Sequence, residues 1–412
     1  MNDSAAPVFD VAIAGGGMVG ASLALALADS ALSVVMIEAS PPDEGPSASF
    51  DDRTTALGNG ARRIFQTLGV WQDIAREAAP IREIHVSDAG RFGFARLRAA
   101  EHDLDAFGYT VTNRHLGKVL WRALRERSRV QLRAPARVQA ALMNEQVARL
   151  TLDDGVALSA RLVIAADGAH SLVKQAAGIP SDARDYQQVA VVAVVRTNRA
   201  SQGVAYERFT DSGPLALLPR FDNSHAVIWT LPPQSAPQYV ACDAGEFCRR
   251  LQQRFGWRAG HIVSVGARAS YPLSLVQARS SVGTRVALIG NAAQTLHPVA
   301  AQGFNLGLRD AAVLAELITA ASDPGAAEVL QAYERHRASD RRGMIRFTDR
   351  LVGVFGQRSA LAGAARDLAL LLFDLSPTAK QALSRLSWGF GPLPRLARGL
   401  PLSGRGRAAP ER

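Results

Sequence analysis

Apolar and polar positions follow two different patterns along the 412-residue chain. Residues 9–40, "FDVAIAGGGMVGASLALALADSALSVVMIEAS", run from an apolar strand through a glycine turn and a stretch with Ala and Leu at helical spacing to a second apolar strand. This order predicts a β-α-β unit. An apolar strand followed by a glycine turn recurs in "RLVIAADGAHSLVK" (161–174) and "RVALIGNAAQT" (285–295).

The second pattern consists of short strands bounded by turn residues. Residues 81–97 alternate around an Asp-Ala-Gly turn and predict a hairpin, while residues 189–275 predict a separate sheet with one helix near 244–256. Residues 109–127 predict a strand followed by an amphipathic helix. From Asp310 to about Trp388 the pattern is mostly helical.

Together the two patterns predict an α/β fold in which a sheet is inserted into a discontinuous first domain. We expect the first domain at 1–80, 100–180 and 280–330, the inserted sheet at 81–99 and 181–279, C-terminal helices at 331–390, and a basic tail at 391–412.

Composition narrows the classes of function. A hydrophobic content of 48% with 20% charged residues is typical of a globular protein, and no apolar run reaches the ~18 residues of a membrane-spanning helix. We therefore expect a cytoplasmic protein. The spacing of Cys242 and Cys248 matches neither a CxxC redox pair nor a zinc half-site, and no cluster of ligands predicts a metal. The net charge is +10, but the arginine-rich end lacks interleaved aromatic residues after Phe390, so nucleic acid is not an expected partner.

The first glycine turn carries a dinucleotide-binding fingerprint. Gly15-x-Gly17-x-x-Gly20 lies between a strand and a helix, and Glu38 ends the next strand. Gly15 permits a tight turn, Gly17 allows close approach to a pyrophosphate, and Gly20 allows the helix to pack closely on the strand. The helix N-terminus favours the phosphates, and Glu38 is suited to accept hydrogen bonds from a ribose. No second fingerprint is present, which indicates one tightly held dinucleotide.

Two further corners extend this pattern. Asp167-Gly168 ends a strand, and "GNAAQTLHPVAAQGFNLGLRD" (290–310) leads from a strand end through His297 and Pro298 into a helix. Each could be an ordinary turn of an α/β sheet. Alternatively, the second segment forms a cradle for an anionic group, because the amides of Gly303, Phe304 and Asn305 begin a helix.

Four motifs carry a family resemblance: "GGGMVG" with Glu38, "FDDRTTAL", "AADGAHS" and the 290–310 segment. Through them the chain resembles the class A flavoprotein aromatic hydroxylases of the para-hydroxybenzoate hydroxylase fold, specifically their ubiquinone-biosynthesis branch. The resemblance covers residues 8–390. The stretches "IHVSDAGRFGF", "YERFTDSGPLALLP" and "QQRFGWRAG" are most similar to hydroxylases of 2-polyprenyl-6-methoxyphenol.

The resemblance implies a Rossmann-type FAD domain, an inserted antiparallel substrate sheet and C-terminal helices. It implies the cofactor-binding residues Gly15, Gly16, Gly17, Val19, Gly20, Glu38, Arg53, Arg114, Asp167, Gly168, Gly290, Asn291, Gln302, Gly303, Phe304 and Asn305. Arg53 and Arg114 could instead be surface ion-pair partners. Two positions depart from the family pattern: Asn291 replaces an Asp, and Ala301 replaces a Gly that could adopt a positive φ.

His297 and Pro298 are the candidate catalytic residues. His297 could act as a general base or could only hydrogen-bond the backbone, and Pro298 is expected to stiffen the loop. The inserted sheet is expected to roof the substrate site, with lining residues drawn from Phe209, Leu215, Leu217, Leu218 and Trp229. Ordinary core packing would explain any one of these five equally well.

The implied activity is FAD-dependent hydroxylation of a polyprenyl phenol with NAD(P)H and O2. The alternatives are a sister hydroxylase acting at another ring position, another FAD enzyme of the same fold, and a non-catalytic flavin scaffold or redox sensor. A halogenase of this fold is expected to carry a W-x-W-x-I-P element. This class is disfavoured because no two tryptophans in the chain are two residues apart. Because a polyprenyl substrate is membrane-borne, we also expect peripheral contact with the inner membrane. A complex with other ubiquinone-biosynthesis proteins and a homo-oligomer are further possible partnerships.

Overall fold

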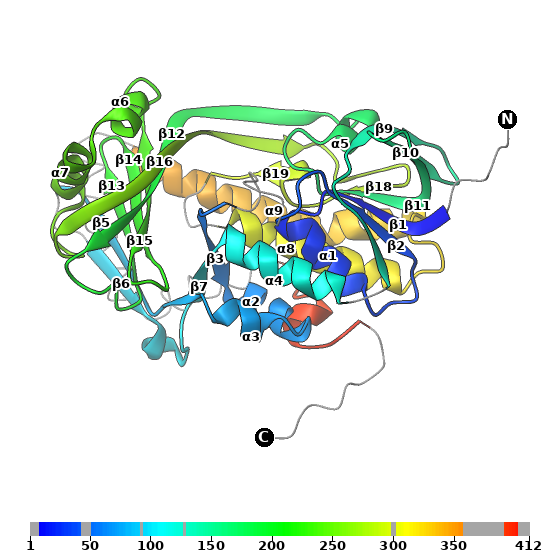
Figure 1. The fold of residues 1–412 in the computed structure, drawn as a ribbon, viewed down its shortest axis with the longest axis horizontal. Coiled ribbons are helices and arrows are strands. Elements are labelled where there is room, and N and C mark those ends of the chain that lie inside the picture. Colours follow the sequence, from blue (N-terminus) through cyan, green and yellow to red (C-terminus); the bar gives the residue numbers. More distant parts are fainter. Residues whose placement is uncertain are drawn as a thin grey trace.

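The computed structural model describes residues 8–42, 51–90, 94–126, 129–297, 302–356 and 391–402. It contains two large sheets, and Figure 1 shows them toward opposite ends of the longest axis. Two long strands of the second sheet, β12 (Ser181–Thr197) and β16 (Ile262–Ala278), run between these ends. A third, three-stranded sheet is formed by β3 (Thr54–Gly58), β7 (Gly108–Thr112) and β4 (Ala79–Ile81).

The first sheet has a parallel core in the order β18-β11-β1-β2-β8. Its parallel strands are β1 (Val8–Ala14), β2 (Val34–Ile37), β8 (Val130–Arg133), β11 (Ala157–Ala165) and β18 (Val286–Leu288). Antiparallel additions are β9 (Val138–Met143), β10 (Ala148–Leu152) and β17 (Val282–Gly283). Since parallel strands end at the same edge, the residues that follow β1, β2, β11 and β18 meet there.

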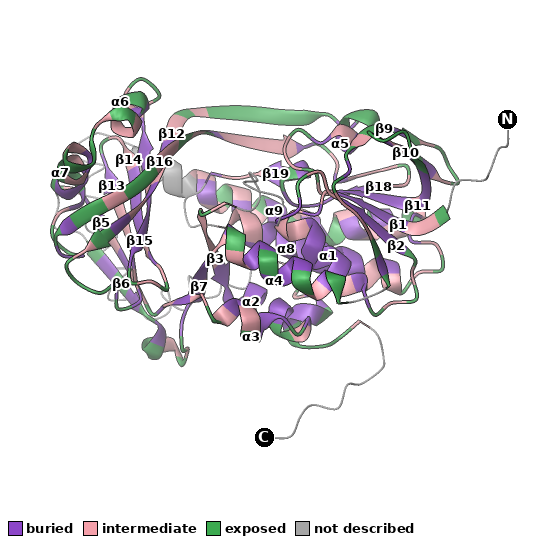
Figure 2. Cartoon of the chain, viewed as in Figure 1, coloured by how far each residue is buried: buried purple, intermediate pink, exposed green. Residues whose placement is uncertain are grey.

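Helices cover this sheet and complete its core. They are α1 (Met18–Leu27), α2 (Asn59–Thr67), α3 (Trp71–Ala75), α4 (Asn113–Arg125), α5 (Leu172–Ala176), α8 (Gly303–Thr319) and α9 (Ala327–Gly356). Leu23 and Leu27 of α1 pack in one cluster with Leu120 of α4 and Leu314 of α8. Figure 2 shows α1 and α8 largely buried, in agreement with their apolar sequences.

The second sheet is mostly antiparallel, in the order β19-β16-β12-β15-β14-β13-β5-β6. Its remaining strands are β5 (Glu83–Asp88), β6 (Phe94–Arg98), β13 (Val204–Thr210), β14 (Gly213–Pro219), β15 (His225–Leu231) and β19 (Gln294–Thr295). The early hairpin β5–β6 joins through parallel pairing of β5 with β13. The helices α6 (Ala236–Ala241) and α7 (Ala244–Phe255) accompany this sheet, and Phe247 and Leu251 of α7 pack on one of its faces.

Three short 3-10 helices complete the described elements: η1 (Ala99–His102), η2 (Gly290–Ala292) and η5 (Arg395–Arg398). The last of these lies in the segment predicted to be the basic tail, 391–412. There, Leu396 and Ala397 are buried, and the Leu396 carbonyl accepts a 2.8 Å hydrogen bond from Thr67. Residues 391–402 are therefore packed on α2, because two apolar side chains among the arginines have a place in the core.

Several predicted segments lie outside the described residues. These are the apolar run "LALLLFDL" (368–375), the rest of the predicted C-terminal helices up to 390, and the tail from 403 onward. Among the described helices, none combines the length and the apolar composition needed to cross a bilayer.

Candidate functional site

A cavity of about 960 Å³ lies at the edge where the parallel strands end. Many of the predicted cofactor-binding residues line it: Gly15, Gly17, Val19, Glu38, Arg53, Asp167, Gly168, Gly290, Asn291, Gly303 and Phe304. The structure thus brings together three segments that are far apart in the chain. Sequence reasoning missed other lining residues, including Thr54, Thr55, Asn113 and Arg137, because they belong to no glycine motif.

The β1–α1 turn needs its glycines for close backbone contacts. Gly15 has φ +101°, and a Cβ there would lie 2.5 Å from the Ala166 carbonyl oxygen. A Cβ on Gly20 would overlap the Gly15 carbonyl oxygen, so α1 can start directly behind β1 only if both positions lack side chains. Gly17 is the N-cap of α1 and makes no side-chain cap. The first-turn amides of α1 are therefore available to an anion.

Glu38, at the end of β2, is held by this turn. Its Oε2 accepts a 2.6 Å hydrogen bond from the Gly16 amide, and its Oε1 accepts one of 2.8 Å from the Ser40 amide. Burial raises the pKa of Glu38, and these amide hydrogen bonds oppose that rise. Gly16 itself is not in the cavity lining, but its carbonyl accepts a 2.9 Å hydrogen bond from the Trp121 indole. Gly16 therefore orients the carboxylate predicted to bind the ribose.

The second corner is Asp167-Gly168, after β11. Gly168 has φ +88°, and Asp167 Oδ2 accepts a 3.0 Å hydrogen bond from the Leu172 amide at the start of α5. Burial raises the pKa of Asp167. Asp167 thus lines the cavity and also binds the first amide of the short helix behind it, whose N-cap is Ser171.

The third corner joins β18 to α8. Gly290 has φ +59°, and a Cβ on Gly307 would lie 2.9 Å from the Gly290 Cα, so the helix and the turn are in close contact. No side chain caps the start of α8, and Gly303 has open space where a Cβ would be. Gly303 and Phe304 line the cavity, whereas the buried Gln302 Oε1 has no hydrogen-bond partner among the described residues. Pro298 and Ala301 lie outside the described residues.

The resemblance implies that Asn305 binds the cofactor, but the structure places its side chain elsewhere. It is not in the lining of the cavity; instead its Oδ1 accepts a 2.8 Å hydrogen bond from the Gly58 amide, and its Nδ2 donates to the Ala56 carbonyl at 2.9 Å. These two bonds tie the first turn of α8 to β3. Asn305 therefore fixes the position of the helix N-terminus.

The two predicted arginines also differ from each other. Arg53 lines the cavity, pairs with Asp51 at 2.5 Å and lies 4.9 Å above the Tyr271 ring. Arg114 is half exposed, pairs with Asp52 at 2.8 Å and is not among the lining residues. A cofactor contact by Arg114 stays a prediction that its position in this structure does not support.

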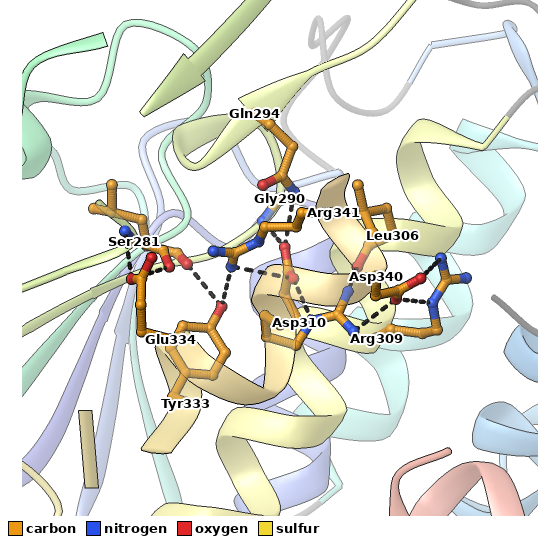
Figure 3. A network of polar contacts seen from close by, with 12 residues as sticks. Ser281, Gly290, Gln294, Leu306, Arg309, Asp310, Tyr333, Glu334, Asp340 and Arg341 are labelled. Atoms are coloured by element: carbon orange, nitrogen blue, oxygen red, sulfur yellow. Dashed lines mark hydrogen bonds and ion pairs between the residues drawn. The ribbon is translucent and has the colours of Figure 1, made fainter. Parts of the chain in front are cut away.

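Beneath the third corner lies a network of buried charges that no sequence motif indicated (Figure 3). Asp310 accepts hydrogen bonds from Arg337 at 2.7 Å, Gln294 at 2.9 Å and the Gly290 amide at 3.3 Å. Although burial opposes ionisation, the guanidinium groups of Arg341 and Arg337 hold the pKa of Asp310 below its usual range. The network therefore anchors the Gly290 turn to α8 and α9.

A second cavity, of about 360 Å³, lies between the second sheet and the start of α8. It shares Thr54, Thr55, Leu296, Gly303 and Phe304 with the first cavity, so the two adjoin. Its roof is built mainly by alternate residues of three neighbouring strands: Ala205 and Glu207 of β13, Pro214, Ala216 and Leu218 of β14, and Ile228 and Thr230 of β15. Tyr206 of β13 also reaches the lining.

This alternation corrects the predicted lining. Leu218 lines the second cavity, but Leu215, Leu217 and Trp229 have the opposite strand parity and pack in the cluster that includes Phe247 of α7. Phe209 is buried but is not among the lining residues. The sequence could not separate the two faces because both are covered, so the strand shows no polar face.

His297 lies where the second cavity meets the β12 strand. It is 1% exposed, its Nε2 lies 3.2 Å from Gln188 Oε1, and its ring packs edge-on to Tyr186 at 5.0 Å. Burial lowers the pKa of His297 to about 4, so the ring is neutral at physiological pH. Its role as a general base stays a prediction.

Comparisons with known proteins agree with this geometry. Residues 8–348 match the family model described as "FAD binding domain". The ubiquinone hydroxylase UbiL of Rhodospirillum rubrum is 39% identical over 97% of this chain and 95% of its own length. The 3-demethoxyubiquinol 3-hydroxylase of Escherichia coli is 34% identical over 80% of this chain and 86% of its own.

Solved structures share the fold at low identity. The p-nitrophenol 4-monooxygenase PnpA of Pseudomonas putida superposes with a TM-score of 0.76 at 20% identity, covering 92% of this chain and 96% of its own. HpxO of Klebsiella pneumoniae, solved with FAD, gives 0.73 at 18% identity, covering 93% of this chain and all of its own. These neighbours confirm the predicted para-hydroxybenzoate hydroxylase-like α/β fold.

The residues present also fit FAD. The lining of the larger cavity includes both Glu38 and Phe304, and the cavity meets two helix N-termini without side-chain caps. Gly303 leaves space where any other residue would place a side chain. Family, fold and site therefore agree: the chain belongs to the FAD-binding domain family and is a flavoprotein monooxygenase that uses FAD, with NAD(P)H and O2 as co-substrates.

Proposed function

We propose that this enzyme hydroxylates the aromatic ring of a polyprenyl phenol in ubiquinone biosynthesis. The observation that carries the proposal is the small cavity that adjoins the larger cavity, the one that fits FAD, at Gly303 and Phe304. Its volume of about 360 Å³ suits one substituted ring, and most of its lining is apolar. The names of the relatives, which are hydroxylases of ubiquinone or demethoxyubiquinol, support the same substrate class.

The chain's own residues would divide the work between the two cavities. The first-turn amides of α1 would hold the pyrophosphate and Glu38 the ribose, while the start of α8 would face the ring end of the cofactor. Bound FAD supplies the redox chemistry that activates O2 for transfer of one oxygen atom to the ring. Leu218, Ile228 and Phe304 would exclude water from the reacting centre.

The finer assignment, 2-polyprenyl-6-methoxyphenol as substrate, rests on the sequence stretches that resemble hydroxylases of that compound. One of them, "YERFTDSGPLALLP" (206–219), forms most of β13 and β14 and so contributes Glu207, Ala216 and Leu218 to the small cavity. A sister reaction at another ring position is the alternative, and product analysis separates the two.

The polyprenyl chain also leads us to propose peripheral contact with the inner membrane. A substrate with such a chain partitions into the bilayer, and the arginine-rich end of the protein would favour an anionic surface. Assembly with other ubiquinone-biosynthesis proteins, or with a second copy of this chain, remains part of the same proposal.

The test uses purified, FAD-loaded protein with NAD(P)H, O2 and a short-chain prenylated methoxyphenol. We expect NAD(P)H oxidation, O2 uptake and a product that carries one added oxygen on the ring, with the position fixed by mass spectrometry and NMR. In a deletion strain the unhydroxylated quinone precursor should accumulate. A protein that binds no flavin, or that shows no ring product with any phenol, would contradict the proposal.

A further inference from the structure

The roof of the small cavity is mostly apolar, but it contains Glu207 and Thr230, beside Tyr206. Glu207 of β13 pairs across the sheet with Ala216 of β14, and Ala216 pairs with Ile228 of β15. Thr230 lies two residues beyond Ile228 and so shares the same face. Glu207 and Thr230 therefore lie on one surface, above the start of α8.

Neither side chain has a hydrogen-bond or ion-pair partner in the part of the chain that the structure describes. Glu207 is partly exposed to the cavity that it lines, and burial raises the pKa of its carboxyl to about 7 without a hydrogen bond or ion pair from a described residue. The Thr230 residue is 1% exposed, and its hydroxyl has no hydrogen-bond partner among the described residues. A buried polar group without a partner is destabilising, so an acceptor and a hydroxyl together in one cavity indicate a ligand that completes their hydrogen bonds.

The surroundings leave Glu207 as the group that can change its charge near neutral pH. Among the titratable and charged side chains nearby, Tyr206 and His297 line the same cavity and Arg53 lines the adjoining one. Arg208 on the same strand as Glu207, and Glu83 and His85 on β5, have the opposite strand parity. Tyr206 packs against Phe255 on the other face of the sheet. His85 and His297 are neutral at pH 7 because burial lowers the pKa of each to about 4.

A metal site is the other chemistry a buried carboxylate could serve. Among the described residues, no three His, Cys, Asp or Glu side chains are grouped closely enough to hold a metal ion. A purely structural glutamate would be expected to pair with an arginine, as Asp310 does with Arg337. No arginine or lysine is among the described residues that line the small cavity, so recognition of a neutral hydrogen-bond donor fits the observations best.

We propose that Glu207 accepts the proton of the substrate's ring hydroxyl and that Thr230 hydrogen-bonds an oxygen substituent of the same ring. The inference rests on the proposed function and specifies how the phenol is recognised and activated. In the step itself, the phenol O–H bond breaks, its electron pair stays on the phenol oxygen, and a new O–H bond forms on the Glu207 carboxylate. The resulting phenolate is richer in electrons at the ring carbons ortho and para to the oxygen, where hydroxylation needs them. The proton returns to the product hydroxyl afterwards, so Glu207 ends the cycle as a carboxylate.

The test compares Glu207→Gln with the wild type and with Glu145→Gln as a matched control. Glu145 is exposed in the turn between β9 and β10, so the control makes the same chemical change far from both cavities. Each FAD-loaded protein is titrated with a short-chain prenylated methoxyphenol in the absence of NAD(P)H, and binding is followed by the change in flavin absorbance between pH 6 and pH 9. FAD stoichiometry reports whether each variant is folded.

For the wild type and Glu145→Gln we expect affinity to rise as pH increases through about 7, because the carboxylate is the stronger acceptor. For Glu207→Gln we expect no such step, roughly tenfold weaker binding at pH 8, and a loss of hydroxylation of order 100-fold with NAD(P)H oxidation uncoupled from product. Thr230→Val should weaken binding while it keeps the pH step. Glu207→Asp should restore the step, which separates the charge from the shape of the side chain.

Two failures can be told apart. If the wild type hydroxylates the phenol and Glu207→Gln keeps both the pH step and the rate of Glu145→Gln, this inference is overturned and the proposed function stands. If the wild type neither binds nor hydroxylates any phenol, both are overturned.

Discussion

The charge network under α8 and the roof of the small cavity both hold polar side chains away from bulk water, but among the described residues only the network pairs them. In the network, Asp310 and Asp340 are fully buried, yet three arginines surround them with ion pairs of 2.7 to 3.2 Å. In the roof, Glu207 and Thr230 have no partner among the described residues. The network holds the Gly290 turn in place, whereas the roof keeps its hydrogen-bonding capacity for a ligand.

The same contrast holds for glycines. Gly307 is needed because the Gly290 backbone leaves no room for a side chain, so it serves packing. Gly303, one turn earlier on α8, faces open space and lines both cavities. Gly303, which faces open space, therefore lines the same small cavity as Glu207 and Thr230, which have no partner among the described residues.

The largest expected effect comes from breaking the network. Asp310→Ala removes the acceptor of Arg337, Arg341, Gln294 and the Gly290 amide and leaves buried guanidinium groups unpaired. We expect the free energy of unfolding to fall by about 3–5 kcal/mol, with loss of FAD. Urea denaturation and FAD stoichiometry measure both quantities, and a loss below about 1 kcal/mol would show that the network is not structural.

The two glycines should respond in opposite ways. Gly307→Ala forces a Cβ to within 2.9 Å of the Gly290 Cα and should cost about 1–3 kcal/mol of stability. Gly303→Ala meets nothing within 4 Å and should leave stability unchanged or raise it by about 0.5 kcal/mol, while its methyl group weakens FAD or substrate binding. Equal losses of stability in the two variants would contradict the distinction between packing and cavity glycines.

Glu207→Gln should stabilise the protein at alkaline pH. Burial raises the folded-state pKa of this carboxyl from 4.5 to about 7, so the wild type loses stability as pH rises between these two values, and the glutamine variant does not. After allowance for water in the cavity, we expect the variant to be more stable by about 2 kcal/mol at pH 8 and equal to the wild type at pH 4. Thermal or urea unfolding at both pH values checks the sign, with Glu145→Gln as the reference that should show no difference.

The smallest expected effect concerns His297. Since burial lowers the pKa of His297 to about 4, His297→Gln should not move an inflection of the hydroxylation rate near pH 7. Loss of its hydrogen bond to Gln188 should cost about 1 kcal/mol of stability. The pH profile of kcat/KM is the measurement. A shift of the inflection in this variant, and not in Glu207→Gln, would reverse the roles that we assign to the two residues.

The Gly15-x-Gly17-x-x-Gly20 turn, Glu38 and the corners at Asp167 and Gly290 could be placed from the sequence because each depends on local rules: a glycine where the backbone turns or approaches closely, and an acidic residue at a strand end. The positions of Asn305 and Arg114 could not be foreseen. Asn305 bonds to β3, some 250 residues away in the chain, and Arg114 pairs with Asp52. Sequence spacing carries no information about such distant contacts.

The sequence by itself determined the order of the elements, the glycine corners and the family, because strand and helix periodicity and backbone freedom are properties of neighbouring residues. The tertiary structure alone decided which face of β13, β14 and β15 looks into the small cavity, since α7 covers one face and the first domain the other and both sides are apolar. It alone decided that Asp310 is paired with arginines whereas Glu207 has no such partner among the described residues. Whether a buried charged side chain has a partner depends on residues that folding brings together from distant parts of the chain. This difference separates the Asp310 network, which stabilises the site, from Glu207, which we propose acts on the substrate.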